Sequence, residues 1–556
     1  MRGSEAIIKV LNEEGINVVF GLPGGAILPL YDELRNSNIR HILVRHEQCA
    51  AHMADGYARV LKKPGVCIAT SGAGATNLVT GIATAFLDSS PVVALTGQVP
   101  TGIIGNDAFQ EADIFSLMIP ITKHNFRVMN SKTLLADLRS AFTIARTGRC
   151  GPVHVDLPRD VQMSEVDDLP KPTSNANGVK ENLVELPQAV ALLESAQRPL
   201  ILVGGGAVWS GCGQEIMTLA EMLMAPVATT LMGKSAVPED HPLVLGMVGM
   251  HGRRVANYAL EECDVLLAIG TRFSDRMIGE PSSCKTKVIH IDIDSAEVGK
   301  NVRPTVSLVG DARKVIRTII NSMQIRRKSG VWAERMRSLR KACACELDVA
   351  DNPIKPQKVI CELNKLLPEN AIITTEVGQC QMFAAHFLEC RGKRTFITAG
   401  GLGTMGFGLP AALGAKIAAP DRVVVDVAGD GSLLMVCQEL ATAVEENIPI
   451  FICLLNNGRL GMIKQLQTLY YGRRYFSMDL GSSPDFRKLA EAFGVRGARV
   501  ENPSDLPSVI EEGINSGKPF LADIHVDREE EVLPVTLRTA NGTQVYQGKC
   551  AWKGVC

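Results

Sequence analysis

The chain has 556 residues, with 58 Lys and Arg against 59 Asp and Glu, and a formal net charge of −1. At roughly 150 residues per domain, this length predicts three or four domains, and the balanced charge gives no basic surface for nucleic acid and no acidic tail. The sequence shows neither a signal peptide nor an apolar run of the roughly 18 residues that a membrane span needs, so we expect a cytoplasmic protein without membrane partners.

Glycine is over-represented, with 51 residues or about 9% of the chain against a usual share of about 7%. Because 46% of the residues are hydrophobic and only 21% are charged, this glycine content does not indicate disorder. The 15 cysteines show no zinc-site or disulfide spacing, which favours reduced thiols. The glycines are therefore expected to serve local turns or ligand sites.

Two segments interrupt the alternation of apolar strands and amphipathic helices. Residues 164–185 are rich in Pro, Asn, Asp and Ser, and residues 325–356 form a charged helical stretch followed by a proline-bounded loop. These breaks predict domains over residues 1–165, 186–330 and 355–540, followed by a short tail over 541–556.

Each predicted domain alternates β-branched runs with helical periodicity. Continuous apolar strands separated by helices predict parallel sheets covered on both faces, so the expected fold class is α/β with three doubly wound parallel-sheet domains. The expected strands are, in chain order, 17–20, 41–44, 66–70, 91–97, 199–206, 264–273, 287–294, 371–378, 422–431, 448–457 and 519–527, with helices over 50–61 and 77–88 in the first domain.

Glycine clusters follow several of these strands, at 21–25, 71–74, 204–206, 400–408 and 429–431. A single cluster can mark no more than a tight turn between strand and helix. Ligands of open α/β sheets bind beyond the carboxyl ends of the strands, so several such clusters together favour ligand sites.

The most specific pattern combines Asp430, in Gly-Asp-Gly-Ser, with Asn457 in a double Asn. The spacing leaves room for one helix, over 433–447, and one return strand, which places both residues at neighbouring strand ends. A carboxylate, an amide oxygen and a loop carbonyl suit Mg²⁺, and Gly431 lets the backbone approach a phosphate. This pattern is typical of thiamine diphosphate enzymes.

Glu47 follows the strand 41–44 and stands at the start of a helix. The macrodipole alone favours a glutamate there. Beside the metal pattern a second role is indicated, because thiamine diphosphate enzymes need a buried carboxylate against the aminopyrimidine ring to activate the cofactor.

From about residue 4 to about 540 the chain resembles the catalytic subunits of acetohydroxyacid (acetolactate) synthases. The resemblance is carried by FGLPGG, RHEQ, SGAGATN, DAFQEADI, ITKHNF, GMHG, TRFSDR, IHIDIDSAEVGKN, GGLGTMGFGLPAA, GDGS, QELATAVE and LNNGRLGM. It implies a pyrimidine-binding first domain, an FAD-binding central domain and a third domain for the diphosphate and Mg²⁺.

The resemblance also implies individual roles around thiamine diphosphate. Glu47 and Gln110 are the expected catalytic residues, and Asp430, Asn457 and the carbonyl of Arg459 are the expected Mg²⁺ ligands. Met405 matches the apolar residue that bends the cofactor; the less favoured alternative is a plain core methionine. The other matched cofactor positions are Pro23, Asn77, Val377, Gly378, Gln379, Gly403, Gly429, Gly431, Ser432, Leu460, Gly461 and Met462.

The central domain carries GGGAVWSG, which departs from GxGxxG because Trp209 occupies the last glycine position. The expectation of FAD therefore rests on matched positions rather than on that motif. These are Arg149, Gly205, Gly206, Thr230, Leu231, Met232, Met250, His251, Gly270, Arg272, Asp275, Arg276, Asp292 and Asp311.

The implied reaction decarboxylates pyruvate and transfers the hydroxyethyl unit to pyruvate or 2-oxobutyrate, giving 2-acetolactate or 2-aceto-2-hydroxybutyrate, the first step of branched-chain amino-acid synthesis. Arg276 is expected to meet the second substrate's carboxylate, unless it is a surface or flavin-neighbouring arginine. Phe109 and Arg159 match substrate positions. Leu466 stands where relatives usually have a tryptophan, which predicts weak preference for 2-oxobutyrate.

In the family, each active site joins domains of two subunits, which implies a homodimer or homotetramer and possibly a small regulatory subunit. Ala73, Leu22 and Cys380 replace a proline, a tyrosine and a diphosphate-binding histidine, which predicts weaker cofactor binding. Two alternatives stay open: another thiamine 2-oxoacid enzyme, such as a pyruvate oxidase, a decarboxylase or a catabolic acetolactate synthase, and a non-catalytic cofactor-binding paralogue.

Overall fold

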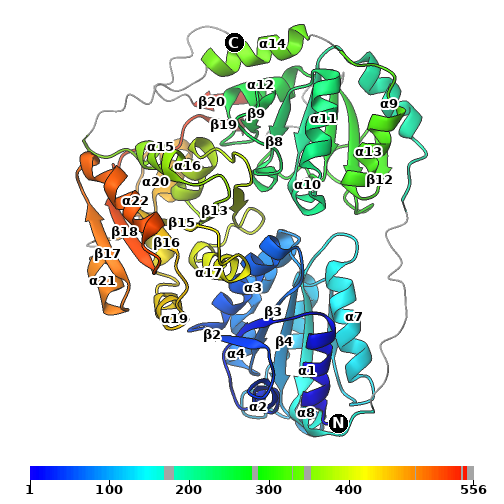
Figure 1. Ribbon diagram of the computed structural model, residues 1–556, viewed down its shortest axis with the longest axis vertical. Helices are drawn as coiled ribbons and strands as arrows, with labels where there is room; N and C mark the ends of the chain where they lie inside the picture. Colours follow the sequence, from blue (N-terminus) through cyan, green and yellow to red (C-terminus); the bar gives the residue numbers. More distant parts are fainter. Residues whose placement is uncertain are drawn as a thin grey trace.

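The computed structural model describes residues 1–167, 181–277, 286–327, 330–342, 352–481, 484–539 and 542–546. Three parallel sheets of six strands each form the N-terminal, middle and third domains (Figure 1). The expected fold class, three doubly wound α/β domains, is confirmed. The centre of the predicted linker at 164–185 lies outside the described residues.

The N-terminal domain has the strand order β2-β1-β3-β4-β6-β5. Its central strands are completely buried, which explains their continuous apolar sequences. The strands are β1 (Val18–Gly21), β2 (Arg40–Leu43), β3 (Gly65–Ala69), β4 (Val92–Gln98), β5 (His124–Arg127) and β6 (Val153–Pro158); the helices are α1 (Gly3–Glu13), α2 (Leu28–Leu34), α3 (Glu47–Leu61), α4 (Ala73–Asn77), α5 (Val79–Leu87), α6 (Ile114–Met118), α7 (Leu134–Arg146) and α8 (Arg159–Met163).

The middle domain has the strand order β12-β11-β10-β7-β8-β9. It extends past the predicted boundary at residue 330, because the buried Trp332 of α14 donates its indole N–H to the carbonyl of Pro199 at 3.0 Å. Its strands are β7 (Pro199–Val203), β8 (Val227–Thr229), β9 (Val244–Met247), β10 (Val265–Ile269), β11 (Lys287–Asp292) and β12 (Val306–Val309); its helices are α9 (Leu186–Ser195), α10 (Gly205–Ser210), α11 (Gly213–Leu223), α12 (Arg254–Glu262), α13 (Ala312–Ser322) and α14 (Val331–Ala342).

The third domain has the strand order β14-β13-β15-β16-β18-β17. Its strands are β13 (Ile372–Thr375), β14 (Thr395–Ile397), β15 (Val424–Gly429), β16 (Phe451–Asn456), β17 (Arg496–Val500) and β18 (Phe520–His525); its helices are α15 (Pro356–Leu366), α16 (Gln379–Phe387), α17 (Gly408–Ala418), α18 (Asp430–Leu433), α19 (Glu439–Glu445), α20 (Gly461–Tyr470), α21 (Phe486–Ala492) and α22 (Leu506–Asn515).

After β18 the chain returns to the middle domain. The amide of Thr536, in β19 (Val535–Thr539), donates to the carbonyl of Met250 at 2.9 Å, and β19 pairs antiparallel with β20 (Gly542–Tyr546). The end of the predicted third domain therefore packs on the middle domain. The predicted tail over 541–556 contributes β20, and the residues after it lie outside the described part of the chain.

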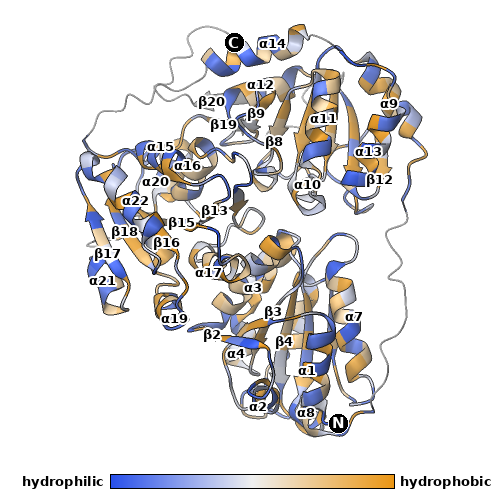
Figure 2. Cartoon of the chain, in the orientation of Figure 1, coloured by the Kyte–Doolittle hydropathy of each residue, from blue (hydrophilic) through white to orange (hydrophobic). Residues whose placement is uncertain are grey.

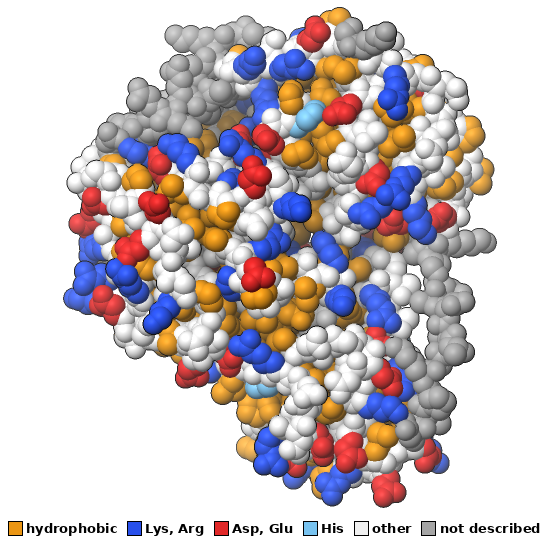
Figure 3. Space-filling view, viewed as in Figure 1, with side chains coloured by type: hydrophobic (Ala, Val, Ile, Leu, Met, Phe, Trp, Pro, Cys, Tyr) orange, Lys and Arg blue, Asp and Glu red, His pale blue; other side chains and the backbone are white. Residues whose placement is uncertain are grey.

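The N-terminal and third domains share one apolar core, in which α3 packs against α17. The approach is close enough that a side chain on Gly56 would collide with the carbonyl of Ala411, and one on Gly414 with that of Met53. Hydrophobic residues fill the sheets, whereas outer helices such as α7 and α11 carry mixed faces (Figure 2). On the face shown in Figure 3, charged side chains of both signs are interspersed, in keeping with the net charge of −1.

The prediction of one continuous helix over 433–447 is wrong. The path from Asp430 to β16 contains two short helices, α18 and α19, with a break over 434–438 where Met435 is 55% exposed. No helix in the described part of the chain is long and apolar enough to cross a membrane.

Candidate functional site

The predicted metal residues lie at the ends of neighbouring strands. β15 and β16 pair in parallel with Gly429 opposite Leu455, so Asp430 and Asn457 follow adjacent strands, as their spacing predicts. One carboxylate oxygen of Asp430, Oδ1, accepts the amide of Gly431 at 2.9 Å. The other, Oδ2, is buried without a hydrogen-bond partner, and burial raises the pKa of this carboxyl to about 6.

A buried, unpartnered carboxylate oxygen is costly unless a ligand satisfies it. Asn457 lies beside it and accepts the amide of Arg459 through Oδ1 at 3.0 Å, so the loop folds back over the strand end. Carboxylate, amide and carbonyl oxygens form the hard donor set that Mg²⁺ prefers. The residues present therefore fit an oxygen-liganded divalent cation.

The surroundings of the predicted diphosphate site are open on one side. Gly378, with φ +141°, precedes α16, and a side chain placed there would meet nothing within 4 Å. The free N–H groups at the start of α16 suit an anion. Cys380 offers no cationic donor there, because a thiol is either neutral or anionic. Burial raises the pKa of this thiol well above the usual value, which keeps it neutral, and it donates to the carbonyl of Glu376 at 3.6 Å.

Glu376 is a site residue that the sequence analysis missed. Its carboxylate accepts the amide of Gly406 at 2.7 Å, the hydroxyl of Ser432 at 2.6 Å and the amide of Leu409 at 3.0 Å. It therefore joins the loop that carries Met405 to the loop that carries Asp430. The only signal in the sequence is a carboxylate at the end of an apolar strand.

Glu47 opens α3 and is 7% exposed. Its Oε2 accepts the side-chain amide of Asn77 at 2.9 Å, so the RHEQ and SGAGATN motifs meet. The backbone just before Glu47 is hydrogen-bonded to the third domain, because Glu439 of that domain accepts the amides of Arg45 and His46 at 2.9 and 3.1 Å. A buried carboxylate is thus held by an amide donor at the carboxyl edge of the N-terminal sheet.

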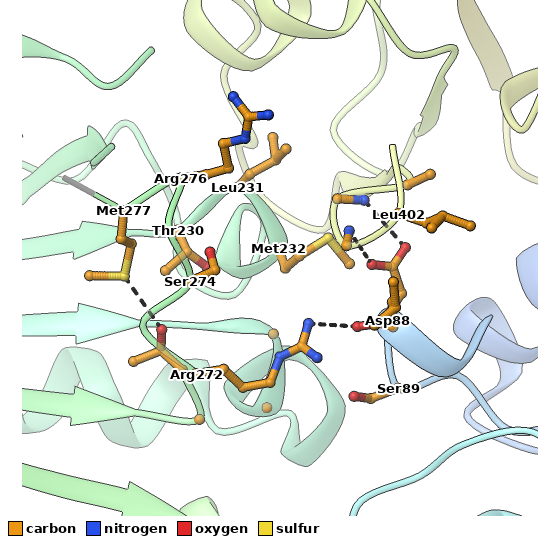
Figure 4. Close-up of a pocket in the computed structure, with 18 of the residues that line it drawn as sticks. Asp88, Ser89, Thr230, Leu231, Met232, Arg272, Ser274, Arg276, Met277 and Leu402 are labelled. Atoms are coloured by element: carbon orange, nitrogen blue, oxygen red, sulfur yellow. Dashed lines mark hydrogen bonds between the residues drawn. The ribbon is translucent and has the colours of Figure 1, made fainter. Parts of the chain in front are cut away.

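A cavity of about 910 Å³ lies where the three domains meet (Figure 4). All fourteen residues predicted to hold the flavin line it, and so do Gly403, Met462 and Leu466 of the third domain. The volume is that of an extended ligand site. The predicted flavin, cofactor and second-substrate positions are therefore continuous in one chain.

The flavin-site residues fit a nucleotide with hydroxyl and phosphate groups. Asp292 ends β11, where burial raises the pKa of its carboxyl to about 6, and Asp311 caps α13 by accepting the amide of Lys314. Trp209 lies on the wall of the cavity with the ammonium of Lys62 4.3 Å from its ring centroid. Trp209 thus presents an aromatic face where a dinucleotide motif has glycine.

Several predicted residues lie elsewhere. Phe109 is 89% exposed, and Gln110 and Arg159 are exposed on the N-terminal domain. None of these, nor Glu47, is among the described residues that line the cavity. Arg276 does line it, at a position where its side chain is 69% exposed. The predicted metal ligands Asp430, Asn457 and Arg459 are likewise not among the described residues that line it.

Comparison with known proteins agrees with this layout. The N-terminal TPP binding domain of thiamine pyrophosphate enzymes matches residues 1–117, the central domain of these enzymes matches 186–319, and their C-terminal TPP binding domain matches 376–524. Each match falls on one of the three sheets.

Full-length relatives are similar throughout. The chain is 51% identical to a probable acetolactate synthase large subunit of Methanocaldococcus jannaschii, over 98% of this chain and 95% of the relative. It is 42% identical to the acetolactate synthase isozyme 2 large subunit of Escherichia coli strain K12, over 98% and 100%. The acetolactate synthase large subunit of Corynebacterium glutamicum is 43% identical over 98% and 90%. The chain belongs to the thiamine pyrophosphate enzyme family, among the acetolactate synthase large subunits.

Proposed function

We propose that this chain is the catalytic large subunit of an acetolactate synthase. It decarboxylates pyruvate and joins the two-carbon unit to a second 2-oxoacid, which gives 2-acetolactate from pyruvate or 2-aceto-2-hydroxybutyrate from 2-oxobutyrate. One observation supports this most strongly: Met462 and Leu466 line the same cavity as Gly403 and the predicted flavin residues. The proposed substrate, thiamine and flavin positions would therefore be continuous.

Thiamine diphosphate, when bound, supplies a nucleophilic carbon and an electron sink for decarboxylation of a 2-oxoacid. Asp430, Asn457 and the carbonyl of Arg459 would hold Mg²⁺, and the start of α16 would hold the diphosphate. Support comes from the unpartnered oxygen of Asp430 and from the open space at Gly378. Met405 would pack under the bound ring.

Glu47 would exchange a proton with the aminopyrimidine ring. A carboxylate held by one amide donor, that of Asn77, keeps its second oxygen available for such a contact. Burial at 7% exposure excludes most water, so the contact would be made in a medium of low dielectric constant.

FAD would occupy the cavity between the domains and have a mainly structural role, because joining two 2-oxoacids with loss of CO₂ moves no net electrons. Arg276 would meet the second substrate's carboxylate from the rim of this cavity. The small side chain of Leu466 would leave space that a larger residue fills in relatives, so pyruvate would compete well as second substrate and 2-acetolactate would dominate.

The complete site would need two chains. Phe109 is 89% exposed, and Gln110 lies next to it on the same face of the N-terminal domain, so both are available to complete a partner's pocket. A homodimer or homotetramer would satisfy this requirement. A small regulatory subunit would bind in addition, since relatives are named large subunits.

The test uses purified protein with pyruvate, Mg²⁺, thiamine diphosphate and FAD, and scores 2-acetolactate, acetaldehyde and acetyl phosphate separately. We expect 2-acetolactate as the main product. Acetaldehyde alone would indicate a decarboxylase, acetyl phosphate an oxidase, and no turnover despite cofactor binding a non-catalytic paralogue. Flavin released on denaturation, read from its absorption spectrum, separates the expected enzyme from a flavin-free catabolic one.

A further inference from the structure

The three residues that end α5 lie where the three domains meet. Leu87, Asp88 and Ser89 all line the cavity of about 910 Å³, and Asp88 is only 6% exposed. Asp88 caps the C-terminus of α5, and the proposed function assigns it no role. Its charge is therefore buried at a junction of domains, where a buried charge requires specific partners.

Asp88 binds the backbone of the third domain directly. Its Oδ1 accepts the amide of Gly401 at 2.7 Å, and its Oδ2 accepts that of Gly400 at 3.3 Å (Figure 4). A side chain on Gly401 would lie 2.7 Å from the Cβ of Leu87 and 2.9 Å from Oδ1 of Asp88. Only glycine permits this approach, so the carboxylate and the glycine loop fit each other.

An arginine completes the contact. Asp88 Oδ2 also accepts Nη2 of Arg59 at 3.0 Å, and Arg59 donates through Nη1 to the carbonyl of Thr398 at 2.8 Å. Arg59 is held in turn by Asp55, at 2.7 and 2.8 Å. The N-terminal domain therefore hydrogen-bonds this segment of the third domain at the carbonyl of Thr398 and at the amides of Gly400 and Gly401.

The helix α5 makes a second contact with the glycine loop, at Thr404. The hydroxyls of Thr84, one turn earlier in α5, and of Thr404 lie 2.7 Å apart. Between these contacts is Gly403, which lines the cavity, and directly after them is Met405. The segment predicted to support the thiamine ring is therefore held by α5 at both of its ends.

Two arginines link the neighbours of Asp88 to the middle domain. Arg272 of the middle domain donates to the carbonyl of Leu87 at 2.5 Å (Figure 4), and Arg149 of the N-terminal domain donates to the hydroxyl of Ser89 at 2.8 Å. Arg149 also pairs with Glu297 of the middle domain at 2.6 Å. Both arginines belong to the predicted flavin site. Residues 87–89 therefore touch the flavin side and the thiamine side of the cavity at once.

We infer that Asp88 is a positioning residue that sets the glycine loop 400–403 for cofactor binding and links the flavin side of the cavity to the thiamine side. The role rests on the proposed function, because it presumes that this loop holds thiamine diphosphate. Asp88 itself touches neither substrate nor reacting atoms; it acts through the backbone amides of Gly400 and Gly401.

Asp88→Asn tests the inference, with Asp55→Asn as the matched control. Both changes remove one carboxylate charge from Arg59, but only Asp88→Asn replaces one of the two oxygens that accept the amides of Gly400 and Gly401 by an NH₂ donor. The dissociation constant of thiamine diphosphate is measured by calorimetry at saturating Mg²⁺, with and without FAD, and thermal unfolding reports the stability of each variant.

We expect Asp88→Asn to weaken thiamine diphosphate binding roughly 10- to 100-fold, as the loss of a charge-assisted hydrogen bond predicts, and FAD to tighten thiamine binding in the wild type but not in this variant. Asp55→Asn should keep the wild-type constant within about threefold, despite a similar loss of thermal stability. Equal dissociation constants of thiamine diphosphate in the two variants would overturn the positioning role of Asp88. A wild type that binds no thiamine diphosphate would instead overturn the proposed function.

Thr84→Val gives a milder change in case Asp88→Asn does not fold. It keeps the shape of the side chain and removes only the hydroxyl that contacts Thr404. The loop would then be held less firmly, and thiamine diphosphate binding should weaken several-fold. An unchanged constant in a folded Thr84→Val protein would contradict the inference.

Discussion

The side-chain amide of Asn77 donates to the carboxylate of Glu47 at 2.9 Å, across 30 residues of sequence. The bond joins the first residue of α3 to the last residue of α4 and fixes the orientation of a buried carboxylate. Oε2 of Glu47 accepts this hydrogen bond, whereas Asn77 donates no hydrogen bond to the other carboxylate oxygen, Oε1. This geometry suits a group that must exchange a proton with a bound ring.

Replacing Glu47 by Gln should slow turnover about 100-fold or more, because the amide keeps the shape but cannot exchange the proton. Steady-state rates at saturating thiamine diphosphate measure the effect. Thermal unfolding and the flavin spectrum should stay close to those of the wild type. Glu215→Gln on α11, a first-turn glutamate that is not among the described residues lining the cavity, is the control and should leave the rate unchanged. A wild-type rate in Glu47→Gln would remove Glu47 from the mechanism.

Replacing Leu466 by Trp should raise the preference for 2-oxobutyrate over pyruvate roughly 10-fold or more, since a larger apolar wall adds contact to the extra methyl group. The ratio of the two acetohydroxyacids from mixed substrates gives the result directly. Leu466→Met, of similar volume, should change the ratio little. If the tryptophan variant shows the wild-type ratio, Leu466 does not line the second-substrate pocket.

Flavin binding should weaken as the pH falls from 7 to 5. Burial raises the pKa of Asp292 to about 6, so the carboxylate that we propose accepts hydrogen bonds from a nucleotide's hydroxyls would be ionised above this pH and protonated below it. Flavin retained after gel filtration at each pH measures the change. Asp292→Asn should bind FAD more weakly and without pH dependence over this range. An identical pH profile in both proteins would exclude Asp292 as the titrating group.

Replacing Cys380 by His should tighten thiamine diphosphate binding about tenfold, because an imidazole adds a donor for the diphosphate where the thiol faces Gly429. Calorimetric titration with thiamine diphosphate gives the constant, and Cys380→Ser, which adds no positive donor, should remain near the wild type. Weaker binding by a folded histidine variant would show that the diphosphate lies elsewhere.

The sequence predicted those parts of the site that local rules constrain. Asp430 and Asn457 were expected at adjacent strand ends because a parallel crossover leaves few alternatives, and β15 pairs with β16 accordingly. Glu376 and Asp88 were not predicted. Each is a single carboxylate at the end of an apolar element, and only the tertiary structure brings their partners, Ser432 and Gly401, within hydrogen-bond distance.

The strands β5, β6, β8, β9, β12, β14 and β17 and the break between α18 and α19 were also missed. β5 is a partly exposed strand with the polar sequence HNFR, and β8 has three residues, so neither carries a clear period. The 433–447 segment has helical composition, but the chain turns at 434–438 and leaves Met435 exposed. Tertiary packing determines the structure of these segments, and the periodicity of the sequence carries no information about that packing.

Hybrid dimers show whether the proposed acetolactate-forming site combines Glu47 of one chain with Asp430 of another. Glu47→Gln and Asp430→Asn chains, each nearly inactive alone, are co-expressed with different tags, and the hybrid is isolated through both. One of its two shared sites then contains both native residues, so 2-acetolactate should form at up to about half the wild-type rate. A hybrid no more active than either parent would contradict the account.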